Sequence, residues 1–330
     1  MHTRPPPPLR REHAPCPVCR ADRARPYRAG MYRIGSEPFD LVRCACGMVY
    51  VDPRPDGPTV GWMYDDPDYY THGYNLGVED QNYFERRDEL VAQYEATARA
   101  LAEELGGTGE LFEIGAAGGF FLEGARRAGF RVRGAELSPP AIAFAREVMK
   151  LDVFAGEFED APLRDESLDV VYADNVLEHS LDPARVLATV RRRLRPGGSL
   201  VVIVPSYVNS PYFRLMDRMR RSLPRKLLGP ALLKLLKFDE QGDNGLPYHL
   251  LEFDRPALER LVRQAGFHVV RVERSVPLPA QLFKKSSPDA RTRLLRTVFL
   301  GLDAGMRGGL LPGARVWLLA RKPDRGASAT

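Results

Sequence analysis

Short apolar segments alternate with helical segments from about residue 85 to residue 205, and this alternation restricts the fold more than any other feature of the chain. Such a pattern is typical of a parallel sheet whose strands are connected by helices. The predicted strands are 111–114 and 131–137, a strand with its following loop within 152–160 and another within 167–179, and a turn followed by a strand within 195–206. Two more strands are predicted at 268–273 and 315–322. We therefore expect an α/β fold: a Rossmann-like, doubly wound, mostly parallel seven-stranded sheet with helices on both faces.

Helix-terminating and helix-capping residues separate these strands. A helix with one apolar face is predicted over 88–105, and Gly106 is expected to end it. Ser138 is expected to cap a following helix, with Pro139 at its first position, where a missing amide hydrogen does no harm.

Changes in composition divide the chain into regions. The first is rich in proline and arginine and is expected to be a disordered tail. The second holds all four cysteines, and the third is an aromatic linker or lid. Two insertions that interrupt the sheet domain are expected to form helical caps, and a short tail follows. The predicted limits are 1–14, 15–60, 61–84, 85–322 (interrupted by 206–247 and 276–313) and 323–330.

Charge and hydropathy limit the partners and the cellular location that we expect for this protein. A net charge of +5 permits an anionic partner but does not require one, because dispersed charge is usually a solvated surface. The sequence has neither an apolar run long enough for a membrane span nor a secretory leader pattern, so a cytoplasmic location is expected. Thiols stay reduced there, which disfavours disulfides between the four cysteines.

The glycine-rich turn after the first strand excludes two classes of ligand site. A dinucleotide fingerprint requires three glycines, and the corresponding positions here are Gly115, Ala117 and Phe120. Phe120 would fill the space that the third glycine leaves for helix packing. No GK[ST] sequence follows the turn, so a phosphate-cradling nucleotide loop is absent as well.

The turn reads Glu113-x-Gly115-x-Ala117-x-Gly119, and Glu136 ends the next strand. This arrangement resembles the first two motifs of class I S-adenosylmethionine-dependent methyltransferases. The resemblance implies a turn that lets the backbone approach a cofactor without phosphates, and a Glu136 carboxylate that accepts hydrogen bonds from the ribose hydroxyls. Ala117 departs from the family, which more often has glycine there, at little cost if its φ is negative.

Four later segments resemble the same family in the same order. Glu157 matches a residue that meets the adenine amino group, and Phe158 a side chain that covers the ring. The segments 169–183, 195–205 and 248–267 match the regions that follow. The resemblance implies a cofactor site formed by Glu113, Gly115, Ala116, Ala117, Gly119, Glu136, Leu137, Glu157, Phe158, Asp174 and Asn175.

The cysteines fall in two pairs, and these resemble the zinc ribbon that precedes the catalytic domain in one subgroup of this family. The resemblance implies that Cys16, Cys19, Cys44 and Cys46 bind one structural zinc ion in a closed tetrahedral site. The second pair is one residue shorter than usual, but residues i and i+2 of a strand point to the same face. Four free cysteines, or a module that docks on nucleic acid, are the alternatives.

Two of the six histidines, His179 and His249, fall in loops expected at the active face. Methyl transfer needs a base only when the acceptor is still protonated, as a hydroxyl or ammonium is. His179 is then the first candidate for the proton acceptor and His249 the second. The alternative is that each histidine is a structural hydrogen-bonding residue.

We therefore expect methyl transfer from S-adenosylmethionine to a small-molecule acceptor in biosynthetic or cell-envelope metabolism, with O-methylation as the first choice. An RNA methyltransferase that docks through the zinc module and a non-catalytic binding protein are the alternatives, although no basic and aromatic pattern in 15–50 favours nucleic acid.

The insertion at 206–247 is expected to cap the acceptor pocket. Within 212–238, Arg and Lys outnumber acidic residues eight to one. An amphipathic lid, a surface for an anionic acceptor and a membrane-surface helix all fit this pattern. Pro224 and Pro230 break the segment and disfavour one long helix lying on a membrane.

Overall fold

The computed structural model describes residues 8–64, 83–206, 249–275 and 315–325, together with the single positions 208, 209, 218, 246, 247 and 297. Apart from residue 206 and these single positions, the predicted caps at 206–247 and 276–313 therefore lie outside the described residues. So does most of the predicted aromatic lid. None of the described helices combines the length and apolar character needed to cross a membrane.

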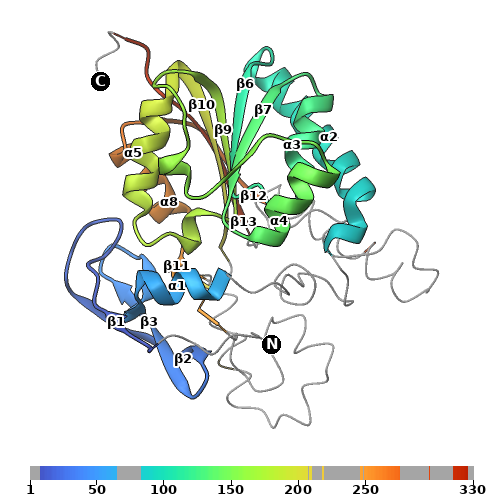
Figure 1. The fold of residues 1–330 in the computed structure, drawn as a ribbon. Coiled ribbons are helices and arrows are strands. Elements are labelled where there is room, and N and C mark those ends of the chain that lie inside the picture. Colours follow the sequence, from blue (N-terminus) through green and yellow to red (C-terminus); the bar gives the residue numbers. More distant parts are fainter. Residues whose placement is uncertain are drawn as a thin grey trace.

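A seven-stranded sheet in the order β12-β13-β10-β9-β6-β7-β8 forms the larger part of the molecule (Figure 1). Five neighbouring strands run parallel, and β13 is antiparallel to both of its neighbours, so the predicted mostly parallel sheet is confirmed. The strands are β6 Glu110–Ile114, β7 Arg131–Glu136, β8 Val153–Ala155, β9 Leu168–Asp174, β10 Leu194–Pro205, β12 His268–Ser275 and β13 Arg315–Arg321.

Helices cover both faces of this sheet because successive strand residues point to opposite sides. In β9, for example, Tyr172 packs with the residues of α2 and α3, whereas Val171 and Ala173 pack with α5 and α8. Figure 1 shows the two groups of helices on either side of the strands. The helices are α2 Arg87–Leu105, α3 Phe120–Arg127, α4 Pro139–Ala143 with a π turn Phe144–Val148, α5 Pro183–Arg193 and α8 Arg255–Gln264.

Helix ends follow the expected chemistry at most positions. Asp182 and Asp254 accept hydrogen bonds from amides in the first turns of α5 and α8, and Gly106 ends α2 with φ +75°. Ser138 occupies the N-cap of α4, but its side chain makes no capping hydrogen bond, contrary to prediction. Prolines at the first two positions of α4 remove amide donors that a capping side chain would meet.

A four-stranded antiparallel sheet in the order β11-β4-β3-β2 forms the N-terminal module, which lies below the large sheet in Figure 1. The strands are β2 Ala24–Ile34, β3 Glu37–Cys44, β4 Val49–Val51 and β11 Leu251–Glu252, and helix α1 Gly57–Tyr64 follows the module. Since β11 belongs to the segment after the first predicted cap, the two sequence regions 15–60 and 248–267 share one sheet.

The prediction of disorder over 1–14 is wrong for residues 11–12, which form a strand. Strand β1, Arg11–Glu12, pairs with β5, Arg54–Pro55. Arg54 donates to the Glu12 carboxylate at 2.9 Å, and the guanidinium of Arg11 lies 4.6 Å from the centroid of the Phe39 ring. Side-chain contacts that the composition does not reveal therefore hold this segment.

Gly124 lets α3 approach α2 closely. A Cβ at this position would lie 2.6 Å from the amide nitrogen of Glu95 and 2.7 Å from the carbonyl carbon of Tyr94. Backbone atoms cannot yield as a side chain does, so we expect Gly124→Ala to lower the free energy of unfolding by about 1–3 kcal/mol. Gly61→Ala is the matched control, since nothing lies within 4 Å of its Cβ position. Urea denaturation measures both, and equal stability of the two variants would contradict the close packing.

Candidate functional site

The sheet reverses its direction of winding between β6 and β9, which lie side by side. Ile114 is paired with Ala173, so Gly115 and Asp174 follow the paired strands at the same edge. In open α/β sheets, ligands bind beyond the carboxyl ends of the strands at such a reversal. The edge carrying these two residues is therefore the candidate binding site.

The turn after β6 approaches the loop after β9. Gly115 has φ +69°, and a Cβ there would lie 2.9 Å from Cγ2 of Val176. Gly119 has φ +79° at the start of α3, and Ala116 is buried. Ala117 has φ +46°, so the negative φ that would make alanine inexpensive there is not found. A left-handed conformation costs a non-glycine residue about 1–2 kcal/mol.

Glu136 faces this turn from the end of β7. Its carboxylate accepts from the amides of Ala117 at 2.8 Å, Leu137 at 2.8 Å and Ser138 at 2.9 Å. These bonds tie the ends of β6 and β7 together and aim the carboxylate at the turn. Leu137 beside it is 43% exposed and offers an apolar surface at the same edge.

Two further acidic residues lie beneath the turn. Burial, followed by the nearby Asp174 and Glu136, raises the pKa of Glu113 well above its usual value. Burial also raises the pKa of Asp174, although Arg315 of β13 donates to this carboxylate and opposes the effect. Arg315 was absent from the sequence prediction because it lies 141 positions after Asp174, beyond a long insertion.

The residues after β8, Glu157 and Phe158, do not take the positions that the resemblance implies. Glu157 is exposed in an extended conformation before the single turn Phe158–Asp160. Phe158 is only 1% exposed, and its ring centroid lies 5.3 Å from that of Phe112 in the core. Aromatic rings from the turn Tyr83–Arg86 lie beside Gly118 instead, since a Cβ there would be 3.3 Å from both Tyr83 and Phe84.

His179 and His249 lie together at the same edge, 70 positions apart in the sequence. Their ring centroids are 5.0 Å apart with the rings at 71°. His179 ends the single turn Leu177–His179, whose backbone is bonded to Val176, the residue beside Gly115. The structure thus brings both predicted proton acceptors to the vicinity of the glycine turn.

Buried carboxylates flank the two imidazoles. Glu178 is fully buried, and its Oε1 lies 3.6 Å from Nε2 of His179. Glu252 is 1% exposed, and its Oε1 lies 3.9 Å from Nδ1 of His249. Burial raises the pKa of Glu178 well above its usual value. Both glutamates belong to segments compared with the family in the sequence, but neither was predicted as a site residue.

The N-terminal module contributes to this cluster. Tyr32 of β2 donates a buried hydrogen bond to Glu252, and the ring of Tyr64 in α1 lies 5.9 Å from that of His179 in an edge-on arrangement. Nothing local in the sequence marks either tyrosine. Their role arises from the pairing of β11 with β4, which joins the module to the large sheet.

The four cysteine sulfurs gather at one end of the module, within 4.8 Å of one another. Cys16 Sγ lies 3.6 Å from Cys46 Sγ, and Cys19 Sγ lies 3.4 Å from Cys44 Sγ. A tetrahedral ion with sulfur ligands at about 2.3 Å separates them by about 3.8 Å, so the set fits zinc. Strand β3 ends at Cys44, and a turn rather than the expected extended strand brings Cys46 to the site.

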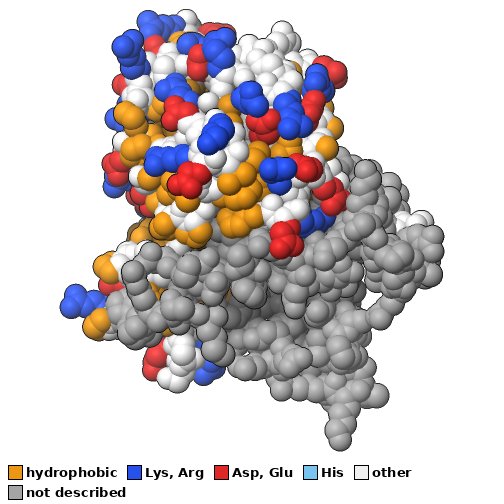
Figure 2. Space-filling model, turned by 45° about the vertical axis from the view of Figure 1, so that its right-hand side comes forward, with side chains coloured by type: hydrophobic (Ala, Val, Ile, Leu, Met, Phe, Trp, Pro, Cys, Tyr) orange, Lys and Arg blue, Asp and Glu red, His pale blue; other side chains and the backbone are white. Residues whose placement is uncertain are grey.

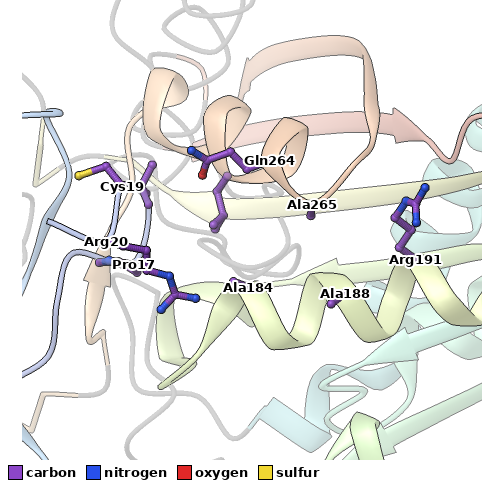
Figure 3. Close-up of a pocket in the computed structure, with 10 residues that line it drawn as sticks. Pro17, Cys19, Arg20, Ala184, Ala188, Arg191, Gln264 and Ala265 are labelled. Carbon is purple, nitrogen blue, oxygen red and sulfur yellow. The ribbon is translucent and has the colours of Figure 1, made fainter. Parts of the chain in front are cut away.

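A groove between the loop of the first cysteine pair and helices α5 and α8 lies apart from these groups (Figure 3). Cys19 and Arg20 face Ala184 and Ala188 of α5 and Gln264 of α8 across it. None of its lining residues belongs to the glycine turn or to the histidine cluster.

Several known proteins are similar to parts of this chain. Residues 112–202 match the family model described as a methyltransferase domain. A probable S-adenosylmethionine-dependent methyltransferase of Mycolicibacterium smegmatis is 27% identical over 58% of this chain and 62% of its own length. A ubiquinone biosynthesis O-methyltransferase of Aromatoleum aromaticum is 29% identical over 49% of this chain and 65% of its own length.

This chain covers less than two thirds of the length of both relatives. Among solved structures, a Haemonchus contortus phosphoethanolamine N-methyltransferase 2 in complex with S-adenosyl-L-methionine has a TM-score of 0.49 and 18% identity, over 84% of this chain and 63% of that one. The matched residues include 112–114 of β6, the glycine turn, Glu136 and β9. Residues 112–202 therefore form a methyltransferase domain, and the chain is similar to S-adenosylmethionine-dependent methyltransferases.

Proposed function

We propose that this protein transfers the methyl group of S-adenosylmethionine to a hydroxyl group of a small-molecule acceptor. The position of the His179–His249 pair carries this proposal. Val176 lies against Gly115, and His179 follows Val176 by three residues, which supports a proton acceptor near the expected position of the donor.

The donor side is formed by the turn and by Glu136. One carboxylate oxygen of Glu136 accepts from the amides of Leu137 and Ser138, and the other accepts from the amide of Ala117. The resemblance to the family implies that this carboxylate accepts hydrogen bonds from the ribose hydroxyls. Leu137, exposed next to it, supports an apolar contact with the adenine ring. Asp174 and Asn175 border the same edge.

The reaction is an in-line displacement. The acceptor oxygen attacks the methyl carbon while the carbon–sulfur bond breaks, and that electron pair stays on sulfur as S-adenosylhomocysteine. The hydroxyl proton must leave, and His179 is the first candidate to accept it, with His249 second. The protein otherwise contributes alignment of the oxygen, carbon and sulfur atoms.

O-methylation is favoured over N-methylation by the paired imidazoles with buried carboxylates behind them. A neutral amine needs no base, whereas a hydroxyl does. The ubiquinone biosynthesis O-methyltransferases among the relatives support the same choice. An anionic small molecule would suit the basic segment at 212–238, whose capping role, like the cytoplasmic location, remains a prediction.

An RNA acceptor is the second candidate. Docking through the N-terminal module would need a continuous basic surface. On the face shown in Figure 2, Lys and Arg alternate with Asp and Glu over the large domain. This face of the large domain thus offers no continuous basic surface for RNA.

We propose further that Cys16, Cys19, Cys44 and Cys46 hold one zinc ion whose role is to fold the module. Four sulfur ligands complete the tetrahedron and leave no position for a substrate, which supports a structural role.

Glu136→Ala tests the donor site. The carboxylate is expected to make a charged hydrogen bond worth about 1.5–3 kcal/mol, so the variant should bind S-adenosylhomocysteine roughly 10- to 100-fold more weakly by calorimetry. Glu110→Ala is the control, because Glu110 lies at the opposite end of β6 in an exposed pair with Arg131. Equal affinities of the two variants would remove Glu136 from the site.

A further inference from the structure

The side chains of Glu178, His179 and His249 form a second group with the donor chemistry of a metal site. From these three residues we infer that the cluster binds a divalent first-row transition metal ion, such as Zn²⁺ or Mn²⁺, in addition to the ion at the cysteines. Imidazole and carboxylate are the ligands that such ions take in catalytic sites.

The geometry needs only a small contraction to coordinate an ion. One ligand atom from each residue lies within 4.8 Å of the others. Ligand atoms at about 2.0–2.2 Å from a tetrahedral ion lie about 3.3–3.6 Å apart, so a shift of less than about 1 Å at each side chain suffices. Side-chain rotations provide such shifts without moving the backbone.

The buried carboxylate of Glu178 is the group in this cluster that most needs a cation. Neither carboxylate oxygen of this fully buried residue has a hydrogen-bond partner among the described residues. An ionised carboxylate buried without donors costs several kcal/mol, and direct binding to a cation offsets that cost. His179 Nε2, at 3.6 Å, is too distant for a hydrogen bond but close enough to share an ion.

Charge balance favours a divalent ion. Glu178 and Glu252 are both buried, and they flank two imidazoles that are neutral when they bind a metal. A 2+ ion makes this set of groups neutral. Glu252 lies 3.9 Å from Nδ1 of His249 and accepts from Tyr32, which places a carboxylate behind a ligand imidazole, as is usual at metal sites.

The consequence for catalysis rests on the proposed function. Three protein ligands leave coordination positions open, and an acceptor oxygen bound there would lose its proton more readily, because a bound cation stabilises the oxyanion. The O–H bond breaks with release of the proton to solvent, the O–C bond forms, and the C–S bond breaks. The imidazoles would then coordinate the ion instead of accepting the proton themselves. The acceptor class is a hydroxyl compound that can bind a metal through oxygen.

Metal content of the full chain tests the inference directly. Plasma mass spectrometry after zinc loading should find two ions per wild-type chain and one in Glu178→Gln and in His249→Ala. Titration with Mn²⁺, followed by its paramagnetic resonance signal, should show one site in the wild type, weakened at least 10-fold in both variants. Glu110→Gln is the matched control and should bind Mn²⁺ as the wild type does.

A wild-type chain that holds only the ion at the cysteines and binds no Mn²⁺ would overturn the inference without recourse to any variant. So would Glu178→Gln and His249→Ala chains that retain both ions. Calorimetry with S-adenosylhomocysteine on the same preparations separates the two proposals. Binding of S-adenosylhomocysteine without a second ion refutes the metal site alone, and a second ion without that binding refutes the proposed donor.

Discussion

Replacing Cys44 with serine is expected to release zinc and unfold the N-terminal sheet. Cys44 is 3% exposed at the end of β3, and its sulfur lies 3.4 Å from that of Cys19. Structural zinc contributes about 10–16 kcal/mol of apparent binding free energy in small modules, and most of it is folding free energy. Losing one of four ligands should therefore exceed the stability of the module. Metal analysis and amide hydrogen exchange over 24–51 measure the two effects.

Removal of zinc from the wild type by a chelator is the control for this variant. It should produce the same loss of exchange protection, and added zinc should restore it only in the wild type. Because Tyr32 of this sheet bonds to Glu252, protection at 249–252 should fall as well. A metal-free protein with unchanged stability would show that the four sulfurs hold no structural ion.

Replacing His179 with glutamine should lower turnover by about 10²-fold or more and leave affinity for S-adenosylhomocysteine nearly unchanged. His179 lies beside His249 and Glu178, whereas no predicted donor contact involves its side chain. The same loss is expected whether the imidazole accepts the proton or coordinates a cation, and metal analysis distinguishes these roles. Single-turnover kinetics and calorimetry give the two quantities.

His268→Gln is the matched control for the second prediction. His268 is exposed at the start of β12, at the far edge of the sheet from β6. Its replacement should leave both turnover and affinity as in the wild type. If His179→Gln lost turnover and cofactor affinity equally, the residue would be structural.

Strands β6, β9 and β10 of the large sheet were predictable because each buries several residues in a row. In β9, alternate side chains enter opposite cores, and that pattern is local. Strand β11 has only two residues, and its partners Val49 and Tyr50 lie about 200 positions away. No local periodicity reveals such a pairing, so the union of the N-terminal module with the large sheet emerged only from the structure.

The candidate site, like the fold, could be predicted from the sequence only in part. His179 and His249 were predicted because both fall in loops expected at the active face, and the structure places their rings 5.0 Å apart, while their catalytic role stays a prediction. Glu252 and Tyr32 could not be found in this way, since their roles depend on long-range contacts. The positive φ of Ala117 was also unexpected, because alanine gives no sign of a left-handed conformation.

The central claim is that the turn at Gly115–Gly119 binds S-adenosylmethionine and not a dinucleotide. Calorimetric titration of the wild-type chain with S-adenosylhomocysteine and, separately, with NAD tests it most directly. We expect one molecule of S-adenosylhomocysteine to bind per chain and NAD to give no measurable heat of binding. Tight binding of NAD, or no binding of S-adenosylhomocysteine by a correctly folded chain, would contradict the assignment.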